Sequence, residues 1–299
     1  MPKKTQMRIL ILGGGGTLGH KLWQMLPSKF PDTFVSIRKN KDFYEKCGLF
    51  TGPNVIDRLD LRDFTGLYHS LDRIHPSVVV NCAGITPRRE EAQNDVNVIT
   101  INSLLPHKLA TWCATNNARL IHFSTDCVFN GEKGNYNELS PSDANDLYGR
   151  TKALGEVNSP SALVLRTSMI GREIFGGTEL LEWFLAQGGK KIKGYRKAVF
   201  SGLTTNQHAV VVGDLIENYP ALTGCYNVAS QAVSKYDLLL MLREVYNLDV
   251  AIESDDSVEC RRDLDGAKFV KATGFSCPPW RQMLTEMAAD KTPYSAWRK

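Results

Sequence analysis

The sequence has 299 residues, 42% of them hydrophobic and 23% charged, and a net charge of +4 at pH 7. Such a chain can bury a sizeable core in one large or two unequal domains, which excludes a disordered protein. No apolar run approaches the roughly 20 residues that span a membrane, and no basic, aromatic-interleaved pattern indicates nucleic acid as a partner. Seven cysteines without a Cys-x-x-Cys pair and six histidines without metal-binding spacing predict no metal site and a reducing, cytoplasmic location.

Short β-rich runs recur at intervals that leave room for a helix between them. Several are continuously apolar, as expected for strands buried on both faces of a parallel sheet. The pattern predicts an α/β fold with a Rossmann-like, doubly wound parallel sheet. The six expected strands cover residues 8–12, 33–37, 77–81, 119–123, 162–166 and 225–229. Residues 100–117 form a helical pattern that Pro106 should perturb.

After about residue 170 the alternation of strands and helices loosens, which predicts a smaller C-terminal lobe. We expect one domain to cover residues 1–169 and to receive a return segment at about 205–229. Residues 170–204 and 230–299 then make up the second lobe.

A glycine-rich loop, ILGGGGTLGHKL at residues 11–22, follows the first expected strand. Gly13, Gly16 and Gly19 fit the pattern Gly-x-x-Gly-x-x-Gly at the start of a helix. Backbone N–H groups at such a turn bind a pyrophosphate, and glycine allows the phosphate to approach closely. A plain tight turn is the alternative, but the strand–loop–helix context favours a dinucleotide.

Two cations follow the second expected strand, where an NAD-selective site usually has an acid. Arg38 and Lys39 suit a 2′-phosphate, which favours NADPH over NADH, although both could simply face solvent. Asp60 ends another polar stretch and could meet the adenine edge, although any polar strand end would look the same. The expected cofactor is therefore NADPH, with NADH as the alternative.

Tyr148 and Lys152 are four residues apart, so they share one face of a helix. A neighbouring ammonium favours the phenolate and brings the phenol pKa toward a usable range. Upstream, the stretch STDC sets a hydroxyl at Thr125, an acid at Asp126 and a thiol at Cys127 side by side. The thiol has no evident activating base, so a cysteine nucleophile is disfavoured.

With these motifs the chain resembles the extended short-chain dehydrogenases/reductases, and among them the dTDP-4-dehydrorhamnose reductase group. The resemblance rests on the glycine pattern at 13–19, DL at 60–61, NCAG at 81–84, Asn102, STDCVF at 124–129, YGRTK at 148–152, GE at 155–156 and RTS at 166–168. These motifs lie in the first 170 residues, and the match is looser beyond them.

The resemblance implies an oxidoreductase that reduces a nucleotide-linked 4-keto-6-deoxy sugar with NADPH, in deoxysugar and polysaccharide biosynthesis. It assigns catalysis to Thr125, Tyr148 and Lys152, and gives the C-terminal lobe to the substrate. It also allows a homodimer. The cofactor would contact Gly13, Gly16, Thr17, Leu18, Gly19, Arg38, Lys39, Asp60, Leu61, Cys82, Ala83, Gly84, Asn102, Tyr148, Lys152, Thr167 and Ser168. The substrate would contact Thr86, Thr125, Asp126 and Met169.

Two departures from the group concern the sugar pocket. Met169 stands where these reductases usually have a tryptophan, and FSGLTT at 200–205 replaces a segment that usually holds Asp-Gln and a proline. The identity of the sugar therefore stays open.

Two other functions stay open as well: an epimerase or dehydratase on the same scaffold, and a catalytically silent NADP-binding regulatory subunit. Cys127 stands where related dehydratases have a second acid, which argues against dehydration. The intact set of Thr125, Tyr148 and Lys152 argues against the silent subunit.

Overall fold

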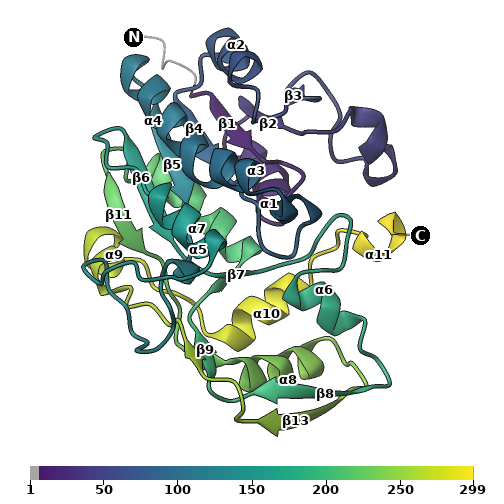
Figure 1. Ribbon diagram of the computed structural model, residues 1–299. Coiled ribbons are helices and arrows are strands. Elements are labelled where there is room, and N and C mark those ends of the chain that lie inside the picture. Colours follow the sequence, from purple (N-terminus) through teal and green to yellow (C-terminus); the bar gives the residue numbers. More distant parts are fainter. Residues whose placement is uncertain (1–6, 299) are drawn as a thin grey trace.

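The computed structural model describes residues 7–298, which contain a central seven-stranded sheet (Figure 1). Its strand order is β11-β6-β5-β4-β1-β2-β3, and every pair within it is parallel. The strands are β1 (Ile9–Leu12), β2 (Thr33–Ser36), β3 (Val55–Ile56), β4 (Val78–Asn81), β5 (Arg119–Phe123), β6 (Ala162–Arg166) and β11 (Gly224–Asn227). The predicted doubly wound fold is confirmed, and only the short β3 was not foreseen.

Alternate residues of the central strands face two separate apolar layers, as the period of a strand requires. Ile9 and Ile11 belong to one core cluster with the helices α1 and α7, whereas Leu10 and Leu12 belong to another with α2 and α4. Continuous apolar strands are therefore buried on both faces. The helix bounds are α1 (Gly19–Met25), α2 (Phe64–Ile74), α4 (Leu105–Thr115) and α7 (Thr205–Glu217).

The helical segment before β5 changes its winding where Pro106 enters. It starts as α3 (Asp95–Ile99), continues as a π-helical turn over Thr100–Leu104, and becomes regular again in α4. Proline has no N–H to donate to the preceding turn, so it is tolerated in the first turn of α4. The predicted perturbation is confirmed, and it takes the form of a π turn just before the proline.

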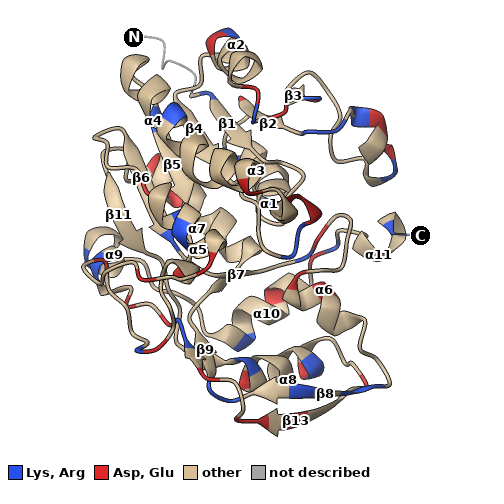
Figure 2. Cartoon of the chain, in the orientation of Figure 1, with Lys and Arg blue, Asp and Glu red and all other residues tan. Residues whose placement is uncertain are grey.

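A second group of strands and helices lies below the central sheet in Figure 1. It contains β8 (Lys191–Tyr195), β9 (Ala198–Phe200), β12 (Val233–Ser234), β13 (Ala251–Asp255), β14 (Cys260–Arg261), α6 (Leu180–Leu185), α8 (Lys235–Val245) and α10 (Trp280–Ala288). β8 and β13 pair in parallel, and Figure 2 shows the cations of β8 beside the acids of β13. Lys193 and Asp255 form one of these cross-strand ion pairs at 2.8 Å. Across residues 7–298, no helix is both long and apolar enough to cross a membrane.

Candidate active site

The loop between β1 and α1 is shaped by close backbone contacts that only glycine permits. Gly13 has a positive φ of 84°, and a Cβ there would lie 3.0 Å from the backbone nitrogen of Ala83. A Cβ on Gly19 would lie 2.2 Å from the carbonyl oxygen of Gly13. The start of α1 can therefore pack directly on the loop, and the loop can pack on the end of β4.

A groove of about 240 Å³ opens beside this loop, at the carboxyl ends of β1, β2 and β4. Doubly wound sheets bind dinucleotides at this edge. The groove is lined by eight of the predicted cofactor residues, namely Gly13, Gly16, Arg38, Asp60, Leu61, Cys82, Ala83 and Gly84. It is also lined by residues that the motifs did not single out, namely Gly15, Ser36, Tyr44, Leu59, Arg62, Ile85, Arg89, Glu91 and Ile101. Exposed glycine backbone next to arginines fits the phosphates of a dinucleotide.

The two cations after β2 differ in their surroundings. Arg38 lines the groove and forms an ion pair with Glu91 at 2.5 Å. Lys39 is exposed, is not part of the groove lining, and holds its ammonium 5.9 Å from the centre of the Phe43 ring. Of the two, only Arg38 therefore lines the groove.

Asp60 lies in the groove but is already engaged by a neighbouring cation. Its carboxylate pairs with Arg62 at 2.5 Å. The side-chain hydrogen bond from Arg62 holds the pKa of Asp60 below its usual value. An adenine edge would therefore meet a charged Asp60–Arg62 pair rather than a free acid.

Several other predicted cofactor residues act from behind the groove. Asn102 is fully buried, and its amide brackets Ile85 by accepting from the backbone nitrogen at 2.8 Å and donating to the carbonyl at 3.0 Å. Leu18 is a buried core residue, and Thr17 is half-buried outside the groove lining. Thr167 is buried, and its hydroxyl donates to the Val228 carbonyl at 2.8 Å. Asn102 therefore supports a lining residue, and none of these four residues lines the groove itself.

The side chains of Thr125 and Tyr148 lie near each other. Asp146 caps the helix α5 (Leu147–Leu154), which carries Tyr148, by accepting from the Gly149 nitrogen at 2.9 Å. Burial raises the pKa of Tyr148, and the charges of Asp126 and Glu179 add to this, while the nearby Thr125 hydroxyl opposes it. The phenol is therefore a neutral O–H donor near pH 7.

Lys152 follows one helical turn after Tyr148 and is buried, with 4% of its surface exposed. Its ammonium donates to the carbonyl of Phe123 at 2.7 Å. Burial lowers the pKa of Lys152 to about 8, although Glu156 and Cys82 oppose the shift. We expected the ammonium to lower the phenol pKa, but the structure differs, since the ammonium points to Phe123 and burial dominates at the phenol.

Asp126 and Cys127 follow Thr125 in the turn after β5. The hydroxyl of Thr125 donates to the Asp126 carboxylate and accepts from the Cys127 nitrogen, both at 3.1 Å. Burial raises the pKa of Asp126, and the hydrogen bond from Thr125 and the charge of Arg262 oppose this shift. Burial also raises the pKa of Cys127 to about 12. The thiol is therefore neutral at pH 7, in line with the prediction that it is not a nucleophile.

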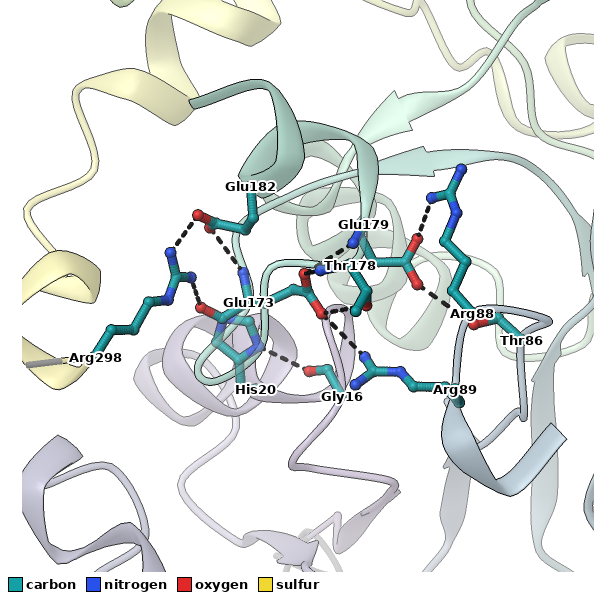
Figure 3. A network of polar contacts seen from close by, with 10 residues as sticks. All are labelled: Gly16, His20, Thr86, Arg88, Arg89, Glu173, Thr178, Glu179, Glu182 and Arg298. Carbon is teal, nitrogen blue, oxygen red and sulfur yellow. Dashed lines mark hydrogen bonds and ion pairs between the residues drawn. The ribbon is translucent and has the colours of Figure 1, made fainter. Parts of the chain in front are cut away.

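The loop after β4 reaches across to the segment before α6 through a network of polar contacts (Figure 3). The Thr86 hydroxyl donates to Glu179 at 3.4 Å, and Arg88 pairs with the same carboxylate at 3.0 Å. Arg89 pairs with the buried Glu173 at 3.2 Å. Thr86 thus joins the loop after β4 to the segment before α6, and its contact with substrate stays a prediction.

A second hollow, of about 290 Å³, lies beyond this network and was not foreseen from the sequence. It combines three cations with two aromatic rings. Its lining residues are Arg88, Thr178, Leu180, Trp183, Lys193, Tyr195, Lys235 and Leu239. Met169, the remaining predicted substrate residue, lies in β7 (Met169–Ile170) with 36% of its surface exposed.

Known proteins with named activities are similar to this chain over most of its length. A dTDP-4-dehydrorhamnose reductase of Aggregatibacter actinomycetemcomitans is 29% identical over 90% of each chain. The probable low-salt glycan biosynthesis reductase Agl14 of Haloferax volcanii is 34% identical over 81% of this chain and 86% of its own. The dTDP-4-dehydrorhamnose reductase of Bacillus anthracis, solved in complex with NADP, shares the fold with a TM-score of 0.77. It is 19% identical and covers 95% of this chain and 99% of its own.

The family model described as the RmlD substrate binding domain matches residues 7–292. This match spans both the central sheet and the second group of strands and helices, and so includes the groove, the hydroxyl pair and the second hollow. The chain belongs to the RmlD substrate binding domain family.

Proposed function

We propose that this protein is an NADPH-dependent reductase of a nucleotide-linked 4-keto-6-deoxy sugar, acting in deoxysugar and polysaccharide biosynthesis. The observation that carries the proposal is the close packing of α5, which carries Tyr148 and the buried Lys152, on the turn that begins at Thr125, since a Cβ on Gly149 would lie 2.2 Å from the Cys127 carbonyl oxygen. Lys152 also lies near Cys82, a lining residue of the dinucleotide groove. This proximity links the set to that groove.

NADPH, when bound, would supply a hydride, and the glycine loop with Arg38 and Ala83 would hold it in the groove. The chain's own groups would act on the substrate oxygen. The hydroxyls of Thr125 and Tyr148 would both donate to the substrate carbonyl and polarise it. Because the pKa of Tyr148 is raised, its proton is present at neutral pH and can pass to the alkoxide that forms.

The second hollow gives a place for the nucleotide part of the substrate. Cations at Arg88, Lys193 and Lys235 suit a diphosphate, and the rings of Trp183 and Tyr195 suit a base. Glu179 links this hollow to the reaction centre, because it pairs with Arg88 and its charge acts on Tyr148. The Aggregatibacter relative, whose name includes a dTDP-linked sugar, supports the same substrate class.

The proposed function includes a cytoplasmic location. It also disfavours dehydration of the sugar, the other reaction that this fold could catalyse. All seven cysteines are free thiols, which suits a reducing cytoplasm. A dehydratase needs a second positioned acid after Asp126, and the neutral Cys127 thiol is a poor substitute.

The decisive experiment mixes the purified protein with NADPH and a panel of nucleotide-linked 4-keto-6-deoxy sugars. We expect loss of reduced-nicotinamide absorbance and a product two hydrogens heavier by mass spectrometry. The control supplies unmodified nucleotide-linked glucose or mannose with oxidised cofactor. A 4-keto-6-deoxy product from that control would show a dehydratase, and nucleotide binding without any turnover across the panel would favour a silent subunit.

A further inference from the structure

The carboxylate of Glu91 lies among three arginines inside the dinucleotide groove. It pairs with Arg38 at 2.5 Å. The charge of Glu91 also acts on Arg62, and the charge of Arg89 acts on Glu91. All four side chains line the groove. Arg62 and Arg89 also have carboxylate partners of their own, Asp60 and Glu173, so Arg38 is the guanidinium that Glu91 binds directly. A guanidinium that binds a carboxylate is equally suited to a phosphate.

The fold determines which part of a dinucleotide would meet this cluster. Arg38 follows β2 by two residues, at the carboxyl end of the strand next to β1. In doubly wound folds the residue at this place distinguishes the 2′-hydroxyl of NADH from the 2′-phosphate of NADPH. Glu91 comes from elsewhere, since it lies in the 3-10 turn Glu90–Gln93 after β4. Arg38, the cation suited to a 2′-phosphate, is therefore already paired with Glu91, an anion of the same chain.

We propose that Glu91 occupies the 2′-phosphate position and competes with that phosphate for Arg38, so that it limits the preference of this protein for NADPH over NADH. The inference rests on the cofactor in the proposed function. A 2′-phosphate carries more negative charge than one carboxylate and three strong acceptors, so it displaces Glu91 at a cost in affinity. NADH has no 2′-phosphate, so its binding does not require this exchange.

The competition does not disappear at neutral pH. The hydrogen bond from Arg38 lowers the pKa of Glu91, so the carboxylate is ionised throughout the physiological range. The pair is partly open to solvent, with 51% of the Arg38 side chain and 31% of the Glu91 side chain exposed. Its contribution is accordingly modest, and we expect effects of a few fold rather than orders of magnitude.

Glu91→Gln tests this directly, because it keeps the size of the side chain and removes its charge. We expect NADPH to bind about two- to five-fold more tightly and NADH binding to stay unchanged. Dissociation constants would be measured by nicotinamide fluorescence without substrate, so that the result does not depend on turnover. The matched control is Glu90→Gln, which removes the same charge from an exposed neighbour in the same turn and should change neither constant. In an Arg38→Ala background the effect of Glu91→Gln on NADPH should vanish.

Three outcomes would overturn the inference. They are an unchanged NADPH constant in Glu91→Gln, an equal gain for both nucleotides, and a weakened NADH constant, which would make Glu91 a ribose ligand instead. Each of these leaves the proposed reductase intact, because the wild type still binds dinucleotide. A wild-type protein that binds neither nucleotide would instead refute the proposed function, and this inference with it.

Discussion

At the scale of single residues, the proposed reaction depends on the phenol of Tyr148, whose proton is retained because burial raises its pKa. Tyr148→Phe removes that proton and keeps the ring. We expect turnover to fall by roughly 100- to 10,000-fold, as for loss of a general acid, with NADPH affinity nearly unchanged. Steady-state kinetics and a fluorescence titration would measure the two effects.

Tyr68→Phe is a suitable control for this change. Tyr68 is a half-buried tyrosine on α2 that packs against the other core cluster. Its substitution should leave turnover as it is. Near-normal turnover of Tyr148→Phe would remove the phenol from the mechanism.

Lys152 illustrates a conflict between function and stability. Burial lowers its pKa from 10.5 to about 8, so the folded state binds a proton less tightly than the unfolded chain does. At pH 7 the buried charge then costs about 3 kcal/mol relative to the neutral amine. Lys152→Met should therefore raise the free energy of unfolding, by up to about 3 kcal/mol at pH 7, while turnover is lost.

The pH dependence gives this prediction its sign. Between pH 8 and 10.5 the unfolded chain binds more protons at Lys152 than the folded protein does, so the wild type gains stability from this group as the pH rises. The advantage of Lys152→Met should therefore shrink between pH 7 and pH 10 in urea unfolding experiments. If the difference in free energy of unfolding stays constant with pH, or if Lys152→Met is less stable than the wild type at pH 7, burial of the Lys152 ammonium does not destabilise the folded protein.

At the scale of elements, α1 can reach the glycine loop only because Gly19 has no side chain. Gly19→Ala places a Cβ 2.2 Å from the Gly13 oxygen and 2.8 Å from the Gly13 carbonyl carbon. Both neighbours are backbone atoms, so helix and loop must separate. We expect a loss of about 1–3 kcal/mol in the free energy of unfolding together with weaker NADPH binding.

Gly213→Ala provides the matched control for Gly19→Ala. It lies inside α7, and its Cβ would meet only a Leu26 methyl at 3.6 Å. Relief of the helix penalty of glycine should stabilise this variant by about 0.5–1 kcal/mol. Equal effects of the two substitutions would contradict the close packing at Gly19.

The elements also show what a sequence can and cannot predict. The central strands were predictable because burial on both faces makes them continuously apolar, as in β1 and β4. β3 has two residues, too few to show a period. The glycine loop follows local rules and was predictable. Glu91 was not, because it meets Arg38 across 53 residues through an irregular turn that carries no periodic signal.

At the scale of the whole molecule, we propose that residues 1–169 with 205–229 form the dinucleotide-binding domain and that 170–204 and 230–299 form the substrate lobe. The segment 290–298 then crosses from the lobe back to α1. Tyr294 hydrogen-bonds His20 at 2.9 Å, and Arg298 pairs with Glu182 of α6. This return ties the helix beside the glycine loop to the helix that borders the second hollow.

The strongest prediction for this connection concerns Lys21 and Asp290, which pair at 2.5 Å with only 3% and 16% of their side chains exposed. Burial alone would raise the pKa of Asp290, but hydrogen bonds from Lys21 and Thr292 lower it well below its usual value. Asp290→Asn leaves the Lys21 ammonium buried without its counter-charge. We expect this to lower the free energy of unfolding by about 3 kcal/mol, and the double variant Lys21→Met/Asp290→Asn should regain most of the loss.

A surface pair provides the comparison that isolates burial. Lys29 and Glu217 also pair, but 45% and 47% of their side chains are exposed, so Glu217→Gln should change stability by less than about 1 kcal/mol.

Acid should act selectively on the buried pair. Since the folded pKa of Asp290 is depressed, its contribution is complete above the unfolded value near 3.8 and is lost as the pH falls below it. The difference between wild type and Asp290→Asn in urea unfolding should therefore narrow from pH 6 to pH 3. If the difference keeps its size at pH 3, or if Glu217→Gln costs as much as Asp290→Asn, the buried charge pair is not what fastens the C-terminal segment to α1.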